Sequence, residues 1–287
     1  MQRNSQTTPT NLGWLFSLPA MLFFSAFFLL PLGALCLRSF FETTSAGVWV
    51  FSLATYKEIF TDPYHLGLLW RTLKLSAMTT CVSILLAFPV ALHLRQMSSR
   101  TRALVTLAVL SPLLTSVIVR TLAWMVLLGP QGTINRTLIS IGWQPYQLMY
   151  NDFGVVVGLT HVFLGYMILS LMATLDRIDD NILLAASNLG ANRWAVLWHV
   201  MIPLSLPGML TGAVLVFTMS ASTYATPVLL GGSKAKVLAT EIYDLAINYL
   251  EFGLAAGMAV VLLLVVALVV LCVTRFVEGG RRRVIFE

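Results

Sequence analysis

Seven hydroxyl-bearing side chains gather in an otherwise apolar stretch of the sequence, residues 211–232, and four of them are singled out here. Thr218 and Ser222 are four residues apart and share one helix face, and Thr223 and Tyr224 follow directly. Pro227 then interrupts the helical pattern. Irregular backbone at membrane depth is tolerated only against protein or a water-filled cavity. The four side chains are therefore candidates to line a pathway or gate for a small polar solute. The alternative, hydroxyls that hold helices together, stays open.

Arg120 is a charged residue inside another apolar run. Pro112 and Ser116 precede it by eight and four residues, on the same face of a continuous helix. A charge at the bilayer centre costs roughly 2.5–3.5 kcal/mol on insertion scales, so the side chain must face protein or water. The sequence leaves two interpretations open. Arg120 lines a pathway or ties two helices together, or it reaches out to the headgroups.

His161 lies in a third apolar run, beside glycines that allow close helix packing. Gly154 and Gly158 form a GxxxG pattern, and Gly165 falls on nearly the same side as Gly158 and His161. No second histidine or carboxylate lies at metal-ligand spacing from His161. We therefore expect a hydrogen-bonded tether between helices and predict no metal site.

The sequence contains no recognisable pattern of catalytic groups. HExxH, GxSxG and paired intramembrane carboxylates are all missing from it, as is the nucleotide-binding pattern GxxxxGK[ST]. The chain is therefore predicted not to be an enzyme and to hold no cofactor. Any ATP must be handled by another protein.

The composition requires lipid as part of the solvent. Of the 287 residues, 58% are hydrophobic and only 10% are charged, whereas soluble domains carry about 25% charged residues. We predict an all-α integral membrane protein that forms a single domain over residues 1–287. The net charge of +6 lies largely beside apolar runs, as orientation signals do, and does not indicate nucleic-acid binding.

Six segments are apolar over the roughly 20 residues that a membrane-spanning helix needs. They are residues 12–37, 74–94, 103–128, 153–175, 208–230 and 253–276. The first is too long for the apolar region of about 7–15 residues in a secretory signal peptide, so we count it as a span.

Arginines predict the orientation of the chain. By the positive-inside bias, the second and fourth connections and both termini are cytoplasmic. The arginines concerned are Arg95, Arg100, Arg102, Arg177, Arg193, Arg275, Arg281, Arg282 and Arg283. The outer connections hold seven acidic residues: Glu42, Glu58, Asp62, Asp152, Glu241, Asp244 and Glu251. An acidic outer face would favour a cationic solute, and ordinary solvated loops are the alternative.

Residues 179–207 form a structured, half-polar segment before the fifth span. Asp179 or Asp180 can cap a short helix, which Gly190 can end. Asn192 can cap a second helix over 193–201, which Pro203 is expected to end. The sequence therefore predicts a rigid cytoplasmic element directly before the hydroxyl-rich span.

The first of these helices carries a low-profile apolar face formed by Ala185, Ala186 and Leu189. Such a face suits insertion into a groove on another protein. A helix that only lies on lipid is the alternative, but it does not explain the small residues. A partner that pushes on this face would move the fifth span.

The segment resembles the cytoplasmic EAA motif of permease subunits in bacterial ATP-binding-cassette importers. Ala185, Ala186 and Gly190 keep the spacing of that motif, and Pro203 completes it. Leu184 stands where the family has glutamate. The resemblance implies a type I importer-like permease whose docking contact is carried by these residues and Leu189, and is more apolar here.

The resemblance extends along nearly the whole chain. The stretches SPLLTSVIVRTLAWMVLLGPQGTIN (111–135) and TPVLLGGSKAKVLATEIYD (226–244) are similar to the spermidine/putrescine-type branch, and to the first of its two permeases. This implies a bacterial inner-membrane complex with a second permease, a cytoplasmic ATPase dimer that binds ATP and Mg²⁺, and a periplasmic solute-binding protein. The implied solute is a polyamine or related amine, or alternatively another small amino-acid-like solute or an organic anion.

A secondary transporter or channel is the competing interpretation. Such a protein would need acidic or histidine relays in mid-membrane. His161 is the only candidate in mid-span, and no intramembrane Asp or Glu accompanies it.

Overall fold

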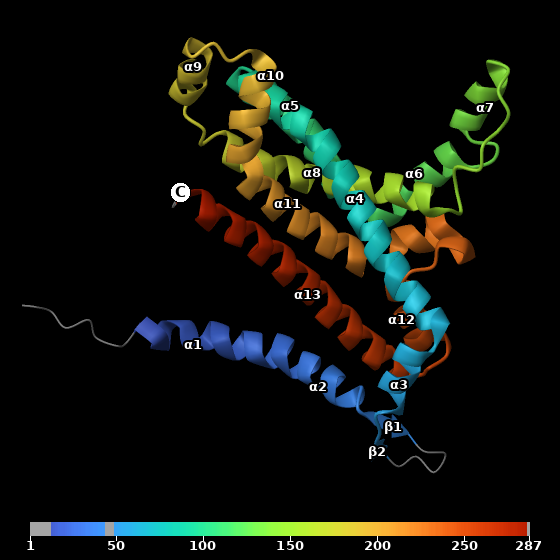
Figure 1. The fold of residues 1–287 in the computed structure, drawn as a ribbon. Helices are drawn as coiled ribbons and strands as arrows, with labels where there is room; N and C mark the ends of the chain where they lie inside the picture. Colours follow the sequence, from blue (N-terminus) through green and yellow to red (C-terminus); the bar gives the residue numbers. More distant parts are fainter. Residues whose placement is uncertain (1–12, 44–48, 286–287) are drawn as a thin grey trace, which may run out of the picture.

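The computed structural model describes residues 13–43 and 49–285, and it is helical apart from one small hairpin (Figure 1). The hairpin pairs β1 (Phe41–Thr43) with β2 (Trp49–Phe51) in antiparallel register. The expected start of the first span at residue 12, and the chain ends 1–12 and 286–287, lie outside the described residues.

The helices follow in chain order, with two long helices, α4 and α13. They are α1 (Gly13–Phe24), α2 (Leu30–Arg38), α3 (Ala54–Thr61), α4 (Pro63–Gln96), α5 (Ser99–Leu114), α6 (Val117–Leu128), α7 (Thr133–Ser140), α8 (Asp152–Leu175), α9 (Asp180–Asn188), α10 (Arg193–Val196), α11 (Ile202–Ser222), α12 (Leu238–Tyr243) and α13 (Phe252–Ile285). Shorter π or 3₁₀ turns are η1 (Ser25–Leu29), η2 (Leu197–Met201), η3 (Pro227–Gly231), η4 (Gly232–Ala235) and η5 (Asp244–Asn248).

Six helical segments in the described part are long and apolar enough to cross a membrane. They are Ser17–Arg38, Pro63–Gln96, Val117–Ser140, Asp152–Leu175, Arg193–Ser222 and Phe252–Arg275. The all-helical class with six candidate spans is therefore as the sequence predicts. At 1.5 Å per residue, the 34-residue α4 is about 51 Å long, so it must tilt in or project from a hydrocarbon core of about 30 Å.

The boundaries of α4 follow from local chemistry. Asp62 accepts a hydrogen bond from the backbone N–H of Tyr64 at 2.8 Å, and Pro63 occupies the first helical position, where its missing N–H costs nothing. The helix ends before Met97, whose backbone is extended, and His93 and Arg95 lie in its last turn. The helix therefore begins eleven residues before the expected apolar run 74–94.

The expected span 103–128 is not one helix. α5 ends at Leu114, Thr115 and Ser116 have extended-type backbone angles, and α6 begins at Val117. Pro112 has no N–H to give to the helix and lies just before this break. Periodicity of apolar residues continues across the break, which is why the sequence alone suggested a single helix.

The fifth span also ends earlier than expected. α11 stops at Ser222, and Thr223 is extended (φ −77°, ψ 137°), so the break precedes Pro227. Pro227 instead opens the π turn η3, at a position where a missing N–H is tolerated.

The core of the molecule lies between α4, α8 and α11, which pack on one another (Figure 1). α8 is the most buried span. Glycines allow this close packing, as expected for helices without a hydrophobic driving force between them. Gly158 of α8 lies against Thr226 and Leu230, and Gly208 of α11 lies against Ser170 and Thr174.

The segment of α1, η1 and α2 stands apart from this core. None of the most apolar window within Ser17–Arg38 is buried, and the start of the segment is separated from the other helices in Figure 1. Its large apolar side chains, such as Phe23 and Phe27, are more than half exposed. This surface is available to lipid or to another chain.

Gly208→Ala tests the packing of α8 on α11. A methyl group there would lie 2.5 Å from Thr174 Oγ1 and 2.7 Å from the backbone oxygen of Ser170. We expect the free energy of unfolding to fall by about 1–3 kcal/mol, because overpacking forces the helices apart. The measurement is the midpoint of thermal aggregation in detergent. Gly67→Ala is the control, since nothing lies within 4 Å of that position. Equal midpoints for the two variants would contradict the packing assignment.

Candidate functional site

The helices α9 and α10 are defined by three local hydrogen-bonding motifs. Asp179 accepts a hydrogen bond from the N–H of Asn181 at 2.9 Å, so Asp179, not Asp180, is the N-cap. Gly190 has φ +85°, and the bonds Gly190 N–H to Ser187 O and Ala191 N–H to Ala186 O form a Schellman motif. Asn192 caps α10 by accepting from the N–H of Ala195 at 2.8 Å. The predicted caps are confirmed.

The apolar face of α9 is uncovered. Leu189 is 89% exposed, Ala185 is exposed and Ala186 is half-buried. Leu184, at the position of the family's glutamate, is also exposed. Trp194 of α10 is exposed as well. An exposed apolar patch of this kind marks an interaction surface.

Two arginines tie this segment to the rest of the bundle. Arg95, at the end of α4, donates through Nη2 to the backbone oxygen of Ile178 at 2.7 Å and to Asp180 Oδ1 at 2.6 Å. Arg102 of α5 pairs with Asp176. The start of α9 is therefore held against the α4–α5 connection.

The expectation that Pro203 ends the second helix is wrong. The chain passes from α10 through η2 into α11 without a break, and Pro203 lies in the first turn of α11. In η2 the N–H of Ile202 bonds to the oxygen of Leu197, five residues back. Pro203 has no N–H and makes no helical hydrogen bond of its own, and as the second residue of α11, directly after this wider turn, it does not end the helix. The exposed segment and the fifth span are thus one continuous helical rod.

The two breaks lie beside neighbouring turns of α8. Leu113 packs on Gly165 and Trp124 bonds to His161, so the break at Thr115 and Ser116 lies between these levels. Across α11, Gly212 packs on Met167 and Thr226 packs on Gly158, so the break at Thr223 and Tyr224 lies near the latter level. The first interruption therefore lies beside the middle of α8, and the second lies nearer to its N-terminal end.

The four hydroxyl-bearing candidates lie at and before the second break. Thr218 and Ser222 are exposed on α11, and Ser222 Oγ donates to the oxygen of Thr218 at 3.0 Å. Thr223 and Tyr224 are half-buried in the break itself. The Tyr224 ring stacks on Tyr243 with a centroid distance of 4.2 Å. The break, which follows directly after the fifth candidate span, thus presents hydroxyls and an aromatic pair.

Arg120 ties two helices together and does not reach the headgroups. It is only 6% exposed, and its Nη1 donates to the backbone oxygen of Pro112. That oxygen belongs to the last turn of α5, and it also accepts a hydrogen bond from the N–H of Thr115 at 3.3 Å. The guanidinium therefore closes the C-terminal end of α5 across the break, and the inter-helix interpretation is the one the structure bears out.

His161 is a tether, as expected. Its Nδ1 accepts a hydrogen bond from Trp124 Nε1 at 3.2 Å, and the two rings meet edge to face at 5.5 Å. This contact joins α8 to α6. Among the described residues, no group of three or more His, Cys, Asp or Glu side chains is arranged to hold a metal ion.

Much of the expected outer acidity is neutralised within the chain. Lys74 Nζ lies 2.8 Å from Asp152, and Lys236 Nζ lies 2.6 Å from Glu241 and 2.8 Å from Asp244. Partial burial lowers the pKa of Lys236, but its hydrogen bonds to Asp244 and Glu241 outweigh that effect and raise the pKa above the usual lysine value. Lys236 therefore stays charged and pairs these carboxylates.

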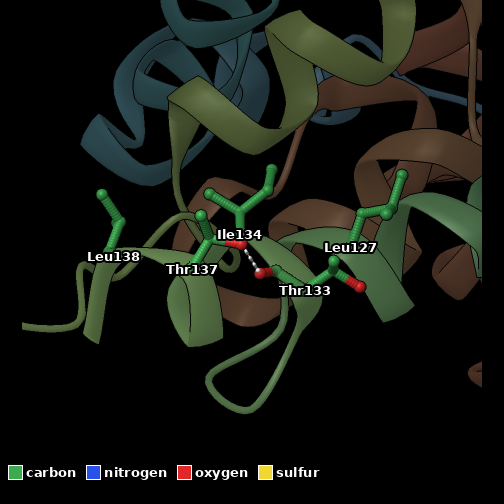
Figure 2. Close-up of a pocket in the computed structure, with 5 residues that line it drawn as sticks. All are labelled: Leu127, Thr133, Ile134, Thr137 and Leu138. Carbon is green, nitrogen blue, oxygen red and sulfur yellow. Dashed lines mark hydrogen bonds between the residues drawn. The ribbon is translucent and has the colours of Figure 1, made fainter. Parts of the chain in front are cut away.

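A small pocket of about 250 Å³ lies elsewhere, at α6 and α7 (Figure 2). Leu127, Thr133, Ile134, Thr137 and Leu138 line it, and Figure 2 shows the Thr137 hydroxyl bonded to the backbone oxygen of Thr133 at 2.9 Å. None of the candidate residues lines this pocket. Its hydroxyls are satisfied locally, so we do not assign it a function.

Comparison with known proteins identifies the class. Residues 76–285 match the family described as the binding-protein-dependent transport system inner membrane component. Because this match covers most of the chain, the chain belongs to that family. It is a permease subunit of an ATP-binding-cassette importer, a multi-pass inner-membrane protein without an ATPase of its own, and not an enzyme.

The names of the individual relatives mention different solutes. The spermidine/putrescine transport system permease protein PotB of Haemophilus influenzae is 28% identical over 220 residues, which cover 75% of this chain and 77% of PotB. The molybdenum transport system permease protein ModB of Mycobacterium bovis is 30% identical over 216 residues, which cover 74% of this chain and 80% of ModB. Family membership therefore does not by itself identify the solute.

Two solved transporters share the fold. A bacterial alginate ABC transporter, solved with an alginate-bound periplasmic protein, aligns with a TM-score of 0.77 at 18% identity over 94% of both chains. The MetNI methionine ABC transporter aligns with a TM-score of 0.56 at 17% identity, over 76% of this chain and 99% of that chain. At these identities the likeness concerns the fold alone.

Sequence reasoning missed Arg95 as the tether of α9 and Tyr243 as the partner of Tyr224. Arg95 was read only as an orientation signal, and Tyr243 lies in a connection without helical periodicity. Both contacts join residues distant in sequence. No local pattern could have indicated them.

Arg95→Ala tests the attachment of α9. Loss of the bonds to Ile178 and Asp180 is expected to raise amide hydrogen exchange across 180–188 about 5- to 30-fold, the change expected for one or two kcal/mol. The measurement is hydrogen exchange by mass spectrometry in detergent. Arg100→Ala, an exposed arginine on the same connection, is the control. Unchanged exchange in Arg95→Ala would show that α9 is held by other contacts.

Proposed function

We propose that this chain forms half of the translocation pathway of an importer for a small amine, most simply a polyamine. The observation that carries the proposal is the continuous helical rod from α10 to the break at Thr223, joined at its exposed end to the apolar face of α9. A displacement of α9 by a bound partner is transmitted along this rod to the hydroxyl-rich break. That is the mechanical requirement for coupling a cytoplasmic ATPase to a membrane pathway.

The coupling segment covers residues 179–207. In this proposal Ala185, Ala186 and Leu189 enter a groove on the ATPase, and Gly190 ends the docking helix with a backbone conformation that favours glycine. Pro203 keeps its place in the motif while the helix continues through it. With Leu184 in place of glutamate, the docking energy comes mainly from apolar burial.

The proposed assembly contains a second permease of the same family, a dimer of cytoplasmic ATPases that binds ATP and Mg²⁺, and a periplasmic solute-binding protein. The exposed apolar surface of α1 and α2 supports a neighbour in the membrane, whether lipid or the second permease. We also propose that both termini are cytoplasmic, because the arginine-rich connection holding Arg95 and Arg102 lies beside α9.

The solute assignment rests on the chemistry near the break together with the PotB relationship. An ammonium group can be bound by hydroxyl oxygens and an aromatic ring, which Thr218, Ser222, Thr223 and Tyr224 supply. Arg120 does not oppose a cation there, because it is buried and engaged with Pro112. The ModB relationship supports an anionic solute as the alternative, but no arginine or lysine accompanies the candidate hydroxyls on α11.

The first experiment is purification of the native complex in mild detergent, followed by mass spectrometry. Recovery of an ATPase and a second six-span permease is expected. Calorimetry on the binding protein, with putrescine, spermidine and molybdate as probes, then separates the amine from the anion. A chain recovered alone, as a monomer or homodimer that transports in liposomes, would overturn the coupled assembly.

Gly190→Arg tests the docking role. The bulky side chain at the end of α9 is expected to abolish copurification of the ATPase while the chain still folds. Gly142→Arg is a matched control, because Gly142 has nearly the same backbone (φ +84° against +85°) and equally open space. The substitutions therefore impose similar strain, of about 1–2 kcal/mol. Retention of the ATPase by Gly190→Arg would refute docking at α9.

A further inference from the structure

Tyr243 is the partner that the sequence did not indicate for Tyr224. The two rings stack with centroids 4.2 Å apart and an angle of 30° between their planes. Tyr224 lies in the break after α11, and Tyr243 is the last residue of α12. Tyr243 is 41% exposed and Tyr224 is half-buried, so the pair is accessible from one side of the break.

Tyr243 belongs to a rigid part of the structure. Lys236 bridges Glu241 and Asp244, at 2.6 and 2.8 Å, across the whole of α12. The helix is also bound to α4, because Tyr64 donates to Glu241 at 3.0 Å and the N–H of Leu238 donates to Thr72 Oγ1 at 2.8 Å. Thr72 is buried, so this last bond is shielded from water.

Tyr224 follows the end of α11, which packs on α4 and α8 but is separated from the next turn by a break in the helix. The two residues Thr223 and Tyr224 separate α11 from the following turn, and the helical bonds that would join the two parts are interrupted there. Beyond the break, Thr226 is buried against Gly158 of α8. A displacement of α11 must therefore be absorbed at Tyr224, where it changes the contact with Tyr243.

Stacked rings cover each other's faces, and those faces attract cations. When the rings separate, both faces become available to an ammonium group. The charge beside the rings favours binding of an ammonium group, because Lys236 faces two carboxylates, Glu241 and Asp244. The cluster next to Tyr243 therefore keeps a net negative charge, which favours amines over anions at this point.

We propose that Tyr224 and Tyr243 form an aromatic gate that is closed by stacking, opened by movement of α11, and selective for amine cations. The inference rests on the proposed function, since the movement is supplied by the ATPase through α9. Tyr243 is thereby a specificity-determining residue, and α12 with its Lys236 bridge holds it in place. The gate couples nucleotide state and solute recognition through one contact.

Cysteine crosslinking in the whole complex tests the gate. Tyr224→Cys and Tyr243→Cys are combined in a chain whose Cys36, Cys81 and Cys272 are replaced by serine, and the complex is reconstituted in vesicles. Oxidation is expected to crosslink the pair in the absence of nucleotide, and ATP with vanadate is expected to slow the crosslinking several-fold. Uptake of labelled putrescine is compared between the oxidised and reduced forms of the same variant, and oxidation is expected to block it reversibly.

A second cysteine pair provides the control. Thr72→Cys and Leu238→Cys join α4 to α12 within the rigid part. Crosslinking of this pair is expected to be independent of nucleotide. Nucleotide-independent crosslinking of the tyrosine positions, or putrescine uptake that survives their crosslinking, would overturn the gate.

Conservative variants separate the ring from the hydroxyl. Tyr243→Phe keeps the aromatic face and is expected to leave the KM for putrescine within about twofold, whereas Tyr243→Leu is expected to raise it about tenfold through loss of the cation contact. Equal KM values for the two variants would refute an aromatic cation site. Copurification of the ATPase with the native chain is scored separately, so failure of the gate and failure of the importer assignment remain distinguishable.

Discussion

The requirement that backbone polar groups be paired inside a bilayer governs this structure. The chain is interrupted at two points beside α8, and each interruption must be compensated. At the first, the backbone oxygen of Pro112 accepts hydrogen bonds from the N–H of Thr115 and from the buried guanidinium of Arg120. At the second, no such charge is present, and hydroxyl and aromatic side chains surround the break at Thr223. The first break is closed by the side chain of Arg120, and the second is where we propose that the solute passes.

The helix from α10 through η2 into α11 is continuous. Proline normally ends a helix, yet Pro203 lies inside a rod that runs from α10 to Ser222. The π turn η2 makes this possible by supplying a hydrogen bond five residues back, from Ile202 to Leu197. As a result, α10, η2 and α11 form one continuous rod that ends at the break at Thr223. α11 packs on α4 and α8, and Arg95 ties the start of α9 to the end of α4.

Ion pairs with lysines reduce the negative charge of the predicted outer connections. Asp152, Glu241 and Asp244 would give an acidic entrance if they were free, but lysines pair with all three. General attraction of cations by the outer face is therefore weaker than the sequence suggests. In the proposed pathway, selection depends on the remaining negative charge beside Tyr243 and on short-range contacts with rings and hydroxyls at the break.

The sequence by itself determined the features that rest on local interactions. Apolar runs identified six candidate spans, and the caps at Asp179, Gly190 and Asn192 depend on bonds within a few residues. The family, too, was evident from one motif of fixed spacing. Only the tertiary structure decided where the spans break, because the apolar pattern continues across Thr115. It alone paired Tyr224 with Tyr243 and Arg95 with Ile178, since each contact depends on packing between helices far apart in the chain.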